Sequence, residues 1–259
     1  MLNITGRVAN NMGRINPVLI VVLMSCASLS GCIFSSKEDS SIDLEVGYDI
    51  TNGTIIETYY EGQLDSTTVV SIAFDFSQTS SFKSLKTFGI DFMDGSEPIT
   101  TDTSMPTIIA NFSNHGIYDI TAFAIDSSDY QQNLTIPIKI DLRIEWLESE
   151  TNDPIPLQFN PIPNNQGKYP TMIEIISHVE NPSLIDGIGD SGQSIQLTWY
   201  LIDELDDICQ SRNGQANDGD TIMWQTIYFN TYMKHELRIN LDDDRDSINI
   251  NQSVSILYD

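Results

Sequence analysis

The stretch Gly116-Ile-Tyr-Asp-Ile-Thr-Ala-Phe-Ala-Ile-Asp126 decides the fold class, because apolar residues and small residues recur in it with a period of two. In an extended strand, alternate side chains point to the same face. One face of this stretch then holds four residues: Tyr118, Ile120, Ala122 and Ala124. We expect this face to lie in the core of a β-sandwich, where the inward sides of two sheets meet.

Six other stretches show the same alternation of apolar and polar residues. They are Val69–Phe76, Leu134–Ile140, Ser194–Tyr200, Thr221–Phe229, His235–Leu241 and Ile248–Leu257. Clusters of Gly, Asn, Asp, Ser and Pro separate these stretches, and helical spacing is hard to find anywhere in the chain. The pattern predicts an all-β protein built of sandwiches rather than a sheet with crossover helices.

Three segments of the first half match, in order, the motifs of one known family. They are Val70-Ser-Ile-Ala-Phe-Asp-Phe-Ser77, Phe88-Gly-Ile-Asp-Phe-Met-Asp-Gly-Ser96, and Asn111-Phe112 followed by Gly116–Asp126. These segments resemble the early strand, the Trp-Asp-Phe-Gly-Asp-Gly signature and the Gly-x-Tyr-x-Val strand of PKD domains, which are Ig-like sandwiches of cell-surface proteins. The resemblance covers residues 45–141. It implies a spacer or a module that contacts proteins and carbohydrates, and it supplies no catalytic residue.

Several positions depart from the PKD pattern while keeping the core apolar. Ile90 stands where the family has Trp, Met93 where it has Gly, Phe112 where it has Tyr, and His115 where Pro is common. The Asp94-Gly95 pair is kept, and it suits a tight turn because Gly tolerates a positive φ.

The second half, residues 142–259, is predicted to form a second, degenerate Ig-like β-sandwich. His235–Asp243 and Ile248–Leu257, joined by an acidic turn, look like the hairpin that Tyr118–Asp126 and Leu134–Ile140 are expected to form in the first sandwich. Five prolines make residues 153–170 an irregular insert or an edge segment, because Pro cannot serve a central strand.

The first 31 residues have the layout of a signal peptide, with two Arg residues, no acid and an apolar core at Pro17–Met24. The core is short against the roughly 20 residues that span a bilayer, so a permanent membrane helix is the weaker interpretation. Leu29-Ser30-Gly31-Cys32 resembles the lipobox of prokaryotic lipoproteins. The resemblance implies cleavage before Cys32, lipid on its sulfur, and a flexible tether over residues 32–44. An ordinary cysteine beside a conventional cleavage site is the alternative.

The charge of the chain excludes nucleic acid as a partner. Removing residues 1–31 leaves 10 basic residues against 37 acidic ones, a formal net charge of −27, whereas phosphate binding needs a basic surface. Solubility explains so much acid more simply than a dedicated basic ligand does. Of the three cysteines, Cys26 is expected to leave with the signal peptide and Cys32 to accept the lipid. Cys209 is then expected to be a small buried or inert residue, because its acidic neighbours disfavour the thiolate, and a reactive thiol is the alternative.

Calcium is the one cofactor that the sequence suggests. Asp242, Asp244 and Asp246 alternate in one short turn and could aim oxygens at a hard cation. An EF-hand is not predicted, because Ser247 replaces its Gly and Ser253 replaces its bidentate Glu. The alternative is a solvated turn. The histidines His115, His178 and His235 lie far apart and show no zinc-ligand spacing.

Function is expected to be binding rather than catalysis. The sequence has no nucleophile elbow, zinc-protease motif, phosphate loop or dinucleotide fingerprint. Aromatic residues gather in the second half, and alternation assigns Trp224 and Tyr228 to one strand face and Phe229 to the other, so one ring set should be core. Rings left exposed would favour carbohydrate binding.

We therefore expect a non-enzymatic, exported lipoprotein anchored at the outer face of the cell envelope. It would act as a stalk or as an interaction module for a surface protein or a polysaccharide. The alternative is a substrate-capturing lipoprotein of a transport or polymer-degrading system.

Overall fold

The computed structural model describes residues 42–183, 194–243 and 247–259. In these residues the chain forms strands joined by turns, and no helix occurs among them. The predicted all-β class is confirmed. All seven stretches that alternate in the sequence lie on strands, which differ from the expected ranges mainly in length.

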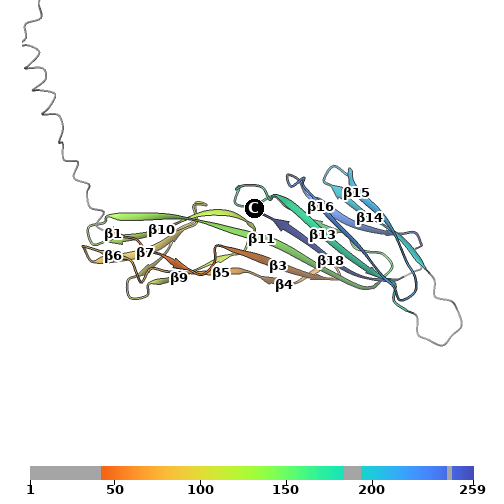
Figure 1. Cartoon of the computed structure of the whole chain (residues 1–259), viewed down its shortest axis with the longest axis horizontal. Coiled ribbons are helices and arrows are strands. Elements are labelled where there is room, and N and C mark those ends of the chain that lie inside the picture. Colours follow the sequence, from red (N-terminus) through yellow and green to blue (C-terminus); the bar gives the residue numbers. More distant parts are fainter. Residues whose placement is uncertain (1–41, 184–193, 244–246) are drawn as a thin grey trace, which may run out of the picture. The chain divides into compact units, whose positions relative to one another are not determined.

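The largest sheet has nine strands (Figure 1). Its main path runs through β16 (Thr221–Tyr228), β13 (Met172–Glu180), β18 (Ile248–Leu257), β11 (Gln131–Thr151), β10 (Gly116–Asp126), β7 (Leu85–Asp91) and β8 (Ile99–Asp102). The other two strands are β3 (Asn52–Tyr60), which pairs in parallel with β11, and β4 (Gln63–Thr68), which pairs with β3.

The strand β11 joins the two halves of the described chain. Its first ten residues pair with β10, and residues 142–151 pair with β18. Figure 1 shows it passing from one group of strands into the other. The sequence boundary expected between residues 141 and 142 falls inside this 21-residue strand.

A three-stranded sheet covers the β7 and β10 part of the large sheet. It consists of β2 (Gly47–Tyr48), β5 (Val70–Asp75) and β9 (Thr107–Phe112). Between the layers, the rings of Phe76 and Phe88 stack with centroids 4.9 Å apart, and Phe112 meets Tyr118 edge to face at 5.2 Å. A short pair, β1 (Ile42–Asp43) and β6 (Ser80–Ser81), lies beside this region.

A four-stranded sheet covers the β13 and β16 part. It consists of β12 (Leu157–Phe159), β17 (His235–Leu241), β14 (Ile195–Asp203) and β15 (Ile208–Ala216). Trp199 on β14 is 1% exposed, and its Nε1 donates a 2.8 Å hydrogen bond to Ser177 Oγ on β13. Its ring also contacts Trp224 at 6.2 Å. Trp199 and Trp224 are therefore core residues, and Phe229 is 67% exposed, so one of the two ring sets of β16 and its end is core, as expected.

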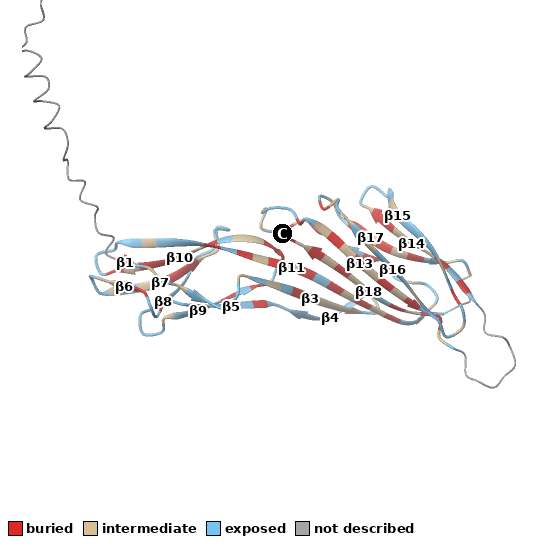
Figure 2. Ribbon diagram, in the orientation of Figure 1, coloured by how far each residue is buried: buried red, intermediate tan, exposed pale blue. Residues whose placement is uncertain are grey.

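Buried and exposed residues alternate along the paired strands (Figure 2). Ile120, Ala122 and Ala124 are fully buried, and Tyr118 is half-buried with its hydroxyl donating to the Asn114 carbonyl at 2.7 Å. The core face predicted for this strand is thus confirmed. Apolar side chains from the parts of the chain before and after β11 form one continuous cluster.

The two predicted hairpins have different outcomes. β10 and β11 form the expected antiparallel hairpin. The second prediction was wrong, because β17 pairs with β14 and β12 while β18 pairs with β11 and β13 in the opposite sheet. Both strands bury alternate residues, so the residue pattern of each strand fits either of the two facing sheets. Closeness in sequence therefore does not ensure that the two strands pair with each other.

The proline-rich segment is an edge segment, as predicted. It contains only the three-residue strand β12, which lies at the edge of the four-stranded sheet. Pro154, Pro156, Pro161 and Pro163 flank this strand and have no backbone N–H to offer a further strand.

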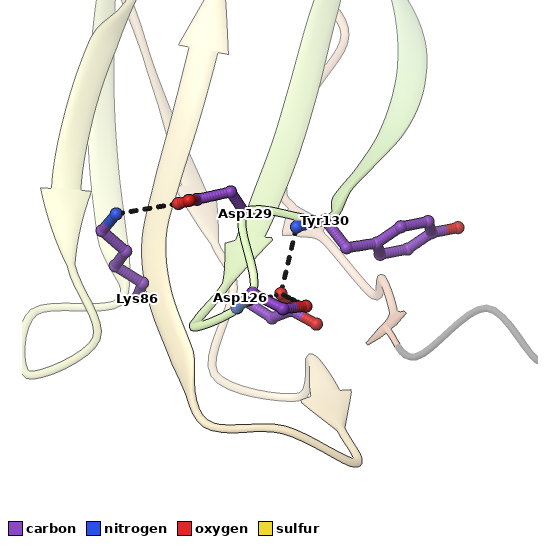
Figure 3. Close-up of polar contacts among 5 residues, drawn as sticks. Lys86, Asp126, Asp129 and Tyr130 are labelled. Atoms are coloured by element: carbon purple, nitrogen blue, oxygen red, sulfur yellow. Dashed lines mark hydrogen bonds and ion pairs between the residues drawn. The ribbon is translucent and has the colours of Figure 1, made fainter.

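Two turns of the PKD-like region are held by aspartates. Asp126 is fully buried, and its Oδ1 accepts bonds from Ser128 N, Ser128 Oγ and Tyr130 N at 2.8, 2.7 and 3.1 Å (Figure 3). In the expected Asp94-Gly95 turn, Asp94 Oδ1 accepts from Ser96 N at 2.9 Å and Gly95 has a φ of 87°. The strand-ending Asp126 is therefore a structural residue.

Candidate functional site

The predicted lipidation site lies outside the described residues. This holds for Cys32 and for the lipobox residues Leu29, Ser30 and Gly31, so the anchor stays a prediction. In the described ranges, no helix is long and apolar enough to cross a membrane.

The calcium hypothesis is also untested, because Asp244 and Asp246 lie outside the described residues. Asp242 is exposed just after β17, and its backbone N–H donates to the Gln196 carbonyl at 3.0 Å. Residues 42–183, 194–243 and 247–259 contain no group of three or more His, Cys, Asp or Glu placed to hold a metal ion.

Cys209 lies half-buried on β15 in the acidic surroundings that its sequence neighbours indicated. Its Sγ is 3.9 Å from Asp203 Oδ2 and 3.7 Å from the Asp207 carbonyl oxygen. It also contacts the hydroxyl of Tyr228, whose pKa is raised to about 12 first by burial and then by the thiol.

A pocket of about 240 Å³ opens between β3 and β12, and we call it the β3–β12 pocket. Its floor is apolar and consists of Ile55, Leu142, Ile144 and Phe159, all buried. These side chains come from β3, β11 and β12, where the four-stranded sheet stops at its short edge strand and leaves part of the large sheet uncovered. The pocket thus exists because β12 is short.

The rim of the pocket is built mainly from neutral polar side chains. Four of them are amides, contributed by Asn114, Gln158, Asn160 and Asn164, and all four residues are exposed. Asn160 Oδ1 accepts from Ile162 N at 3.1 Å, which leaves its NH₂ group as a donor. Among the described residues, the Gln158 amide has no hydrogen-bond partner.

A docked loop over residues 160–167 forms one wall of the pocket. Asn164 Nδ2 donates to Asn114 Oδ1 at 2.8 Å, and Asn165 Nδ2 donates to the Ile117 carbonyl at 2.9 Å. This approach requires glycine at position 116, because a Cβ there would lie 2.9 Å from Asn165 Nδ2. The glycine of the PKD-like Gly-x-Tyr segment therefore positions a wall of the pocket.

His115 closes the inner end of the pocket. It is 8% exposed, its Nδ1 lies 2.7 Å from the Tyr258 hydroxyl, and it also bonds to the backbone of Asn160. Burial lowers the pKa of His115 below its ordinary value. The imidazole is therefore neutral at pH 7 and joins the C-terminal strand region to the pocket wall.

Among the residues that the structure describes, Glu57 is the one carboxylate that lines the pocket. Its Oε2 accepts a 3.2 Å bond from the Tyr59 hydroxyl, and the Tyr59 ring stacks on Trp146 with centroids 5.4 Å apart. Burial, and then the nearby Glu57 charge, raise the pKa of Tyr59, so its hydroxyl stays protonated.

This arrangement suits a small, neutral ligand rich in hydroxyl groups. An amide both donates and accepts hydrogen bonds, so neighbouring amides can satisfy hydroxyls that do the same. An apolar floor with a few polar groups at the rim is the usual form of a small-molecule site. Residue pattern alone did not predict this site, although Asn160, Asn164 and Asn165 stand among the prolines of the same segment.

No protein-family model and no curated protein sequence matches this chain. Solved structures that are similar to this chain include two described as β-sandwich or fibronectin III-like modules. One is a carbohydrate-binding module of the β-sandwich superfamily, 10% identical over 86% of this chain and 94% of that chain, with a TM-score of 0.30. Another comprises fibronectin III-like modules of Clostridium thermocellum CbhA, 13% identical over 83% and 94%, with a TM-score of 0.26.

A third similar structure is SGBP-B of the Bacteroides ovatus mixed-linkage glucan utilization locus, solved with a heptasaccharide. It is 8% identical over 80% of this chain and 52% of that chain, with a TM-score of 0.23. With TM-scores of this size, these likenesses say nothing about what the present chain binds.

Proposed function

We propose that this protein is a non-catalytic interaction module that holds a neutral, hydroxyl-rich ligand, such as the end of a sugar chain, in the β3–β12 pocket. The observation that carries the proposal is the amide rim over an apolar floor, in a chain whose net charge of −25 would otherwise favour acidic walls. A neutral ligand leaves no charge to be compensated when it is desolvated in such a pocket.

The binding proposal is tested by calorimetry on the full chain in detergent, with neutral disaccharides and with glucuronate as probes. The double variant Gln158→Ala, Asn160→Ala should weaken binding of a neutral probe by about tenfold, because it removes two amides at the rim. The matched control is Gln63→Ala, an exposed amide on β4 outside the pocket, which should bind normally. Binding that is unchanged in the double variant would contradict the proposal.

We further propose that the module is exported and anchored by lipid on Cys32 at the outer face of the cell envelope. Support comes from the lipobox-like Leu29-Ser30-Gly31-Cys32 at the end of the apolar run. Two acyl chains on one thiol anchor a protein stably, where one chain binds only marginally.

The anchor is tested by fractionation and by mass spectrometry of the membrane-extracted protein. Cys32→Ser should release the protein from membranes and abolish the lipid mass. Cys26→Ser is the matched control, because Cys26 is removed with the signal peptide, and this variant should stay membrane-bound. An unmodified Cys32 in the membrane fraction would overturn the anchor.

A further inference from the structure

The outward side of the four-stranded sheet carries a second polar surface, which we call the β14 face. Leu197, Trp199 and Leu201 of β14 point inward and are buried, so the residues between them point outward. Strand register places two rows of three side chains across β17, β14 and β15. They are Asn240, Thr198 and Asn213, and then Arg238, Tyr200 and Ser211.

The two rows of the β14 face contain no carboxylate, although 37 of the 259 residues in the chain are acidic, and Glu236 is the next outward residue of β17. Its one cation, Arg238, is neutralised by Glu236, because the Arg238 Nε donates to Glu236 Oε1 at 2.8 Å. Thr198 Oγ1 donates to Asn213 Oδ1 at 3.1 Å, which leaves the Asn213 NH₂ group as a donor toward solvent. The face therefore offers amides, hydroxyls and one half-buried tyrosine with no net charge.

The outward side of the large sheet has a different character. There, register brings Arg143, Ser255, Glu174 and Ile227 into one row, and the neighbouring row contains Glu145. Arg143 pairs with Glu145 at 3.2 Å, and Gln225 donates to Glu174 at 3.2 Å. That row places the charged residues Arg143 and Glu174 side by side with an apolar one, whereas the two rows of the β14 face hold four amide or hydroxyl side chains beside Arg238 and Tyr200.

A hollow of about 450 Å³ extends the β14 face along β17. β12 pairs only with residues 235–237, so the rest of the β17 edge is left without a strand partner within the described sheet. Arg238 and Asn240 line the hollow from one side, and Asp153, Pro154 and Pro156 line it from the other. Backbone groups of the open edge add donors and acceptors to those of the side chains.

We propose that the β14 face and its hollow form a second binding surface, which takes an internal stretch of a neutral polysaccharide chain. Three strands at about 4.8 Å spacing make the face roughly 10 Å wide, which suits a stretch of polymer better than a single ring. None of the six side chains lines the β3–β12 pocket, so this surface goes beyond the proposed function.

The test is affinity electrophoresis of the full chain in detergent-containing native gels. Separate gels hold mixed-linkage β-glucan, galactomannan or the anionic polygalacturonate. The chain should be retarded by at least one neutral polymer and not by polygalacturonate. The triple variant Tyr200→Ala, Asn213→Ala, Asn240→Ala should be retarded much less, with an apparent affinity for the polymer that is lower by about tenfold or more. Fluorescence of the buried tryptophans, of which Trp199 lies beneath the face, checks that the variant is folded.

The matched control replaces two outward residues of the large sheet, Gln225→Ala and Ser253→Ala, and should migrate as the unchanged chain does. Equal retardation of the triple variant, retardation in polygalacturonate alone, or retardation in no neutral gel would overturn the second surface. The pocket variant Gln158→Ala, Asn160→Ala separates the two proposals. If disaccharide binding depends on the pocket while the triple variant is still retarded, only the inference about the β14 face fails.

Discussion

Met93 has a left-handed backbone, with a φ of 56°, at the position where PKD domains have glycine. A non-glycine residue in this backbone conformation destabilises the folded protein by on the order of 1 kcal/mol or more. The side chain is 66% exposed, so little packing is lost with it. Met93→Gly should therefore raise the free energy of unfolding by about 1 kcal/mol, measured by urea titration.

Met93→Ala is the control, because alanine keeps the backbone penalty and removes the same side chain. It should leave the stability unchanged within about 0.5 kcal/mol. Equal stabilisation by both substitutions would show that the side chain, and not the backbone conformation, is the cause.

Stability should fall when the pH drops below about 6.5, the usual pKa of histidine. Burial lowers the pKa values of His115 and His235 in the folded protein. Their contribution to the free energy of unfolding is therefore complete above the pKa of the unfolded chain, and it is lost as the pH falls toward the pKa of the folded protein. Burial raises the pKa values of Asp141 and Glu148 in the folded protein. The contribution of these two carboxyl groups to the free energy of unfolding has the opposite pH dependence, because it decreases as the pH rises through their pKa values in the folded protein.

The histidine effect is isolated by comparing the unchanged chain with His115→Gln at pH 7.5, 6.5 and 5.5. The stability difference between the two proteins should shrink as the pH falls, because only the unchanged chain loses the neutral His115. A difference that is independent of pH would contradict this assignment.

At the scale of elements, the buried carboxylate of Asp126 holds the β10–β11 turn. Asp126→Ala removes the acceptor for three hydrogen bonds from residues of the turn, at about 1 kcal/mol for each bond, so it should cost about 3 kcal/mol of unfolding free energy. Asp126→Asn keeps one acceptor oxygen and should cost less. Thermal and urea unfolding followed by circular dichroism measures both.

Lys86→Ala is a control on the same turn (Figure 3). Lys86 pairs with Asp129 at 3.0 Å, but the two side chains are 61% and 78% exposed. An exposed ion pair contributes little, so this substitution should change the stability by less than about 1 kcal/mol. A cost equal to that of Asp126→Ala would contradict the structural role given to Asp126.

Strands were predictable where apolar residues alternate without interruption, whereas strand pairing was predicted correctly for the β10–β11 hairpin and wrongly for β17 and β18. β13 and β15 were missed, because β13 places Ile175 and Ile176 side by side and β15 is largely polar with Gly214 in it. Gly214 is needed because a Cβ there would lie 2.6 Å from the Trp199 ring. That constraint comes from a residue of another strand, which local pattern cannot reveal.

At the scale of the whole molecule, the shared strand β11 and the continuous core predict a single unfolding transition. The three tryptophans, Trp146, Trp199 and Trp224, all follow residue 142, so their fluorescence reports on the second half, while far-UV circular dichroism reports on all strands. The two urea curves should coincide. Separate midpoints would show that the halves unfold independently.

The candidate pocket could not be predicted from the sequence, because its wall joins positions far apart in the chain. Glu57, Asn114 and Gln158 meet only through the parallel pairing of β3 with β11 and the docking of the 160–167 loop. Acidic and aromatic residues cluster within short stretches of the sequence, whereas the amides of the pocket come together only in the folded chain, from segments that are far apart in sequence.

The continuous strand β11 also has a mechanical consequence. At about 3.3 Å per residue, its 21 residues extend over roughly 70 Å, and its hydrogen bonds to β10, β18 and β3 run along most of that length. Tension applied along the strand loads these bonds in shear, all at once, rather than unzipping them one by one. A protein held at one end and pulled by a bound polymer at the other would carry the load through this strand.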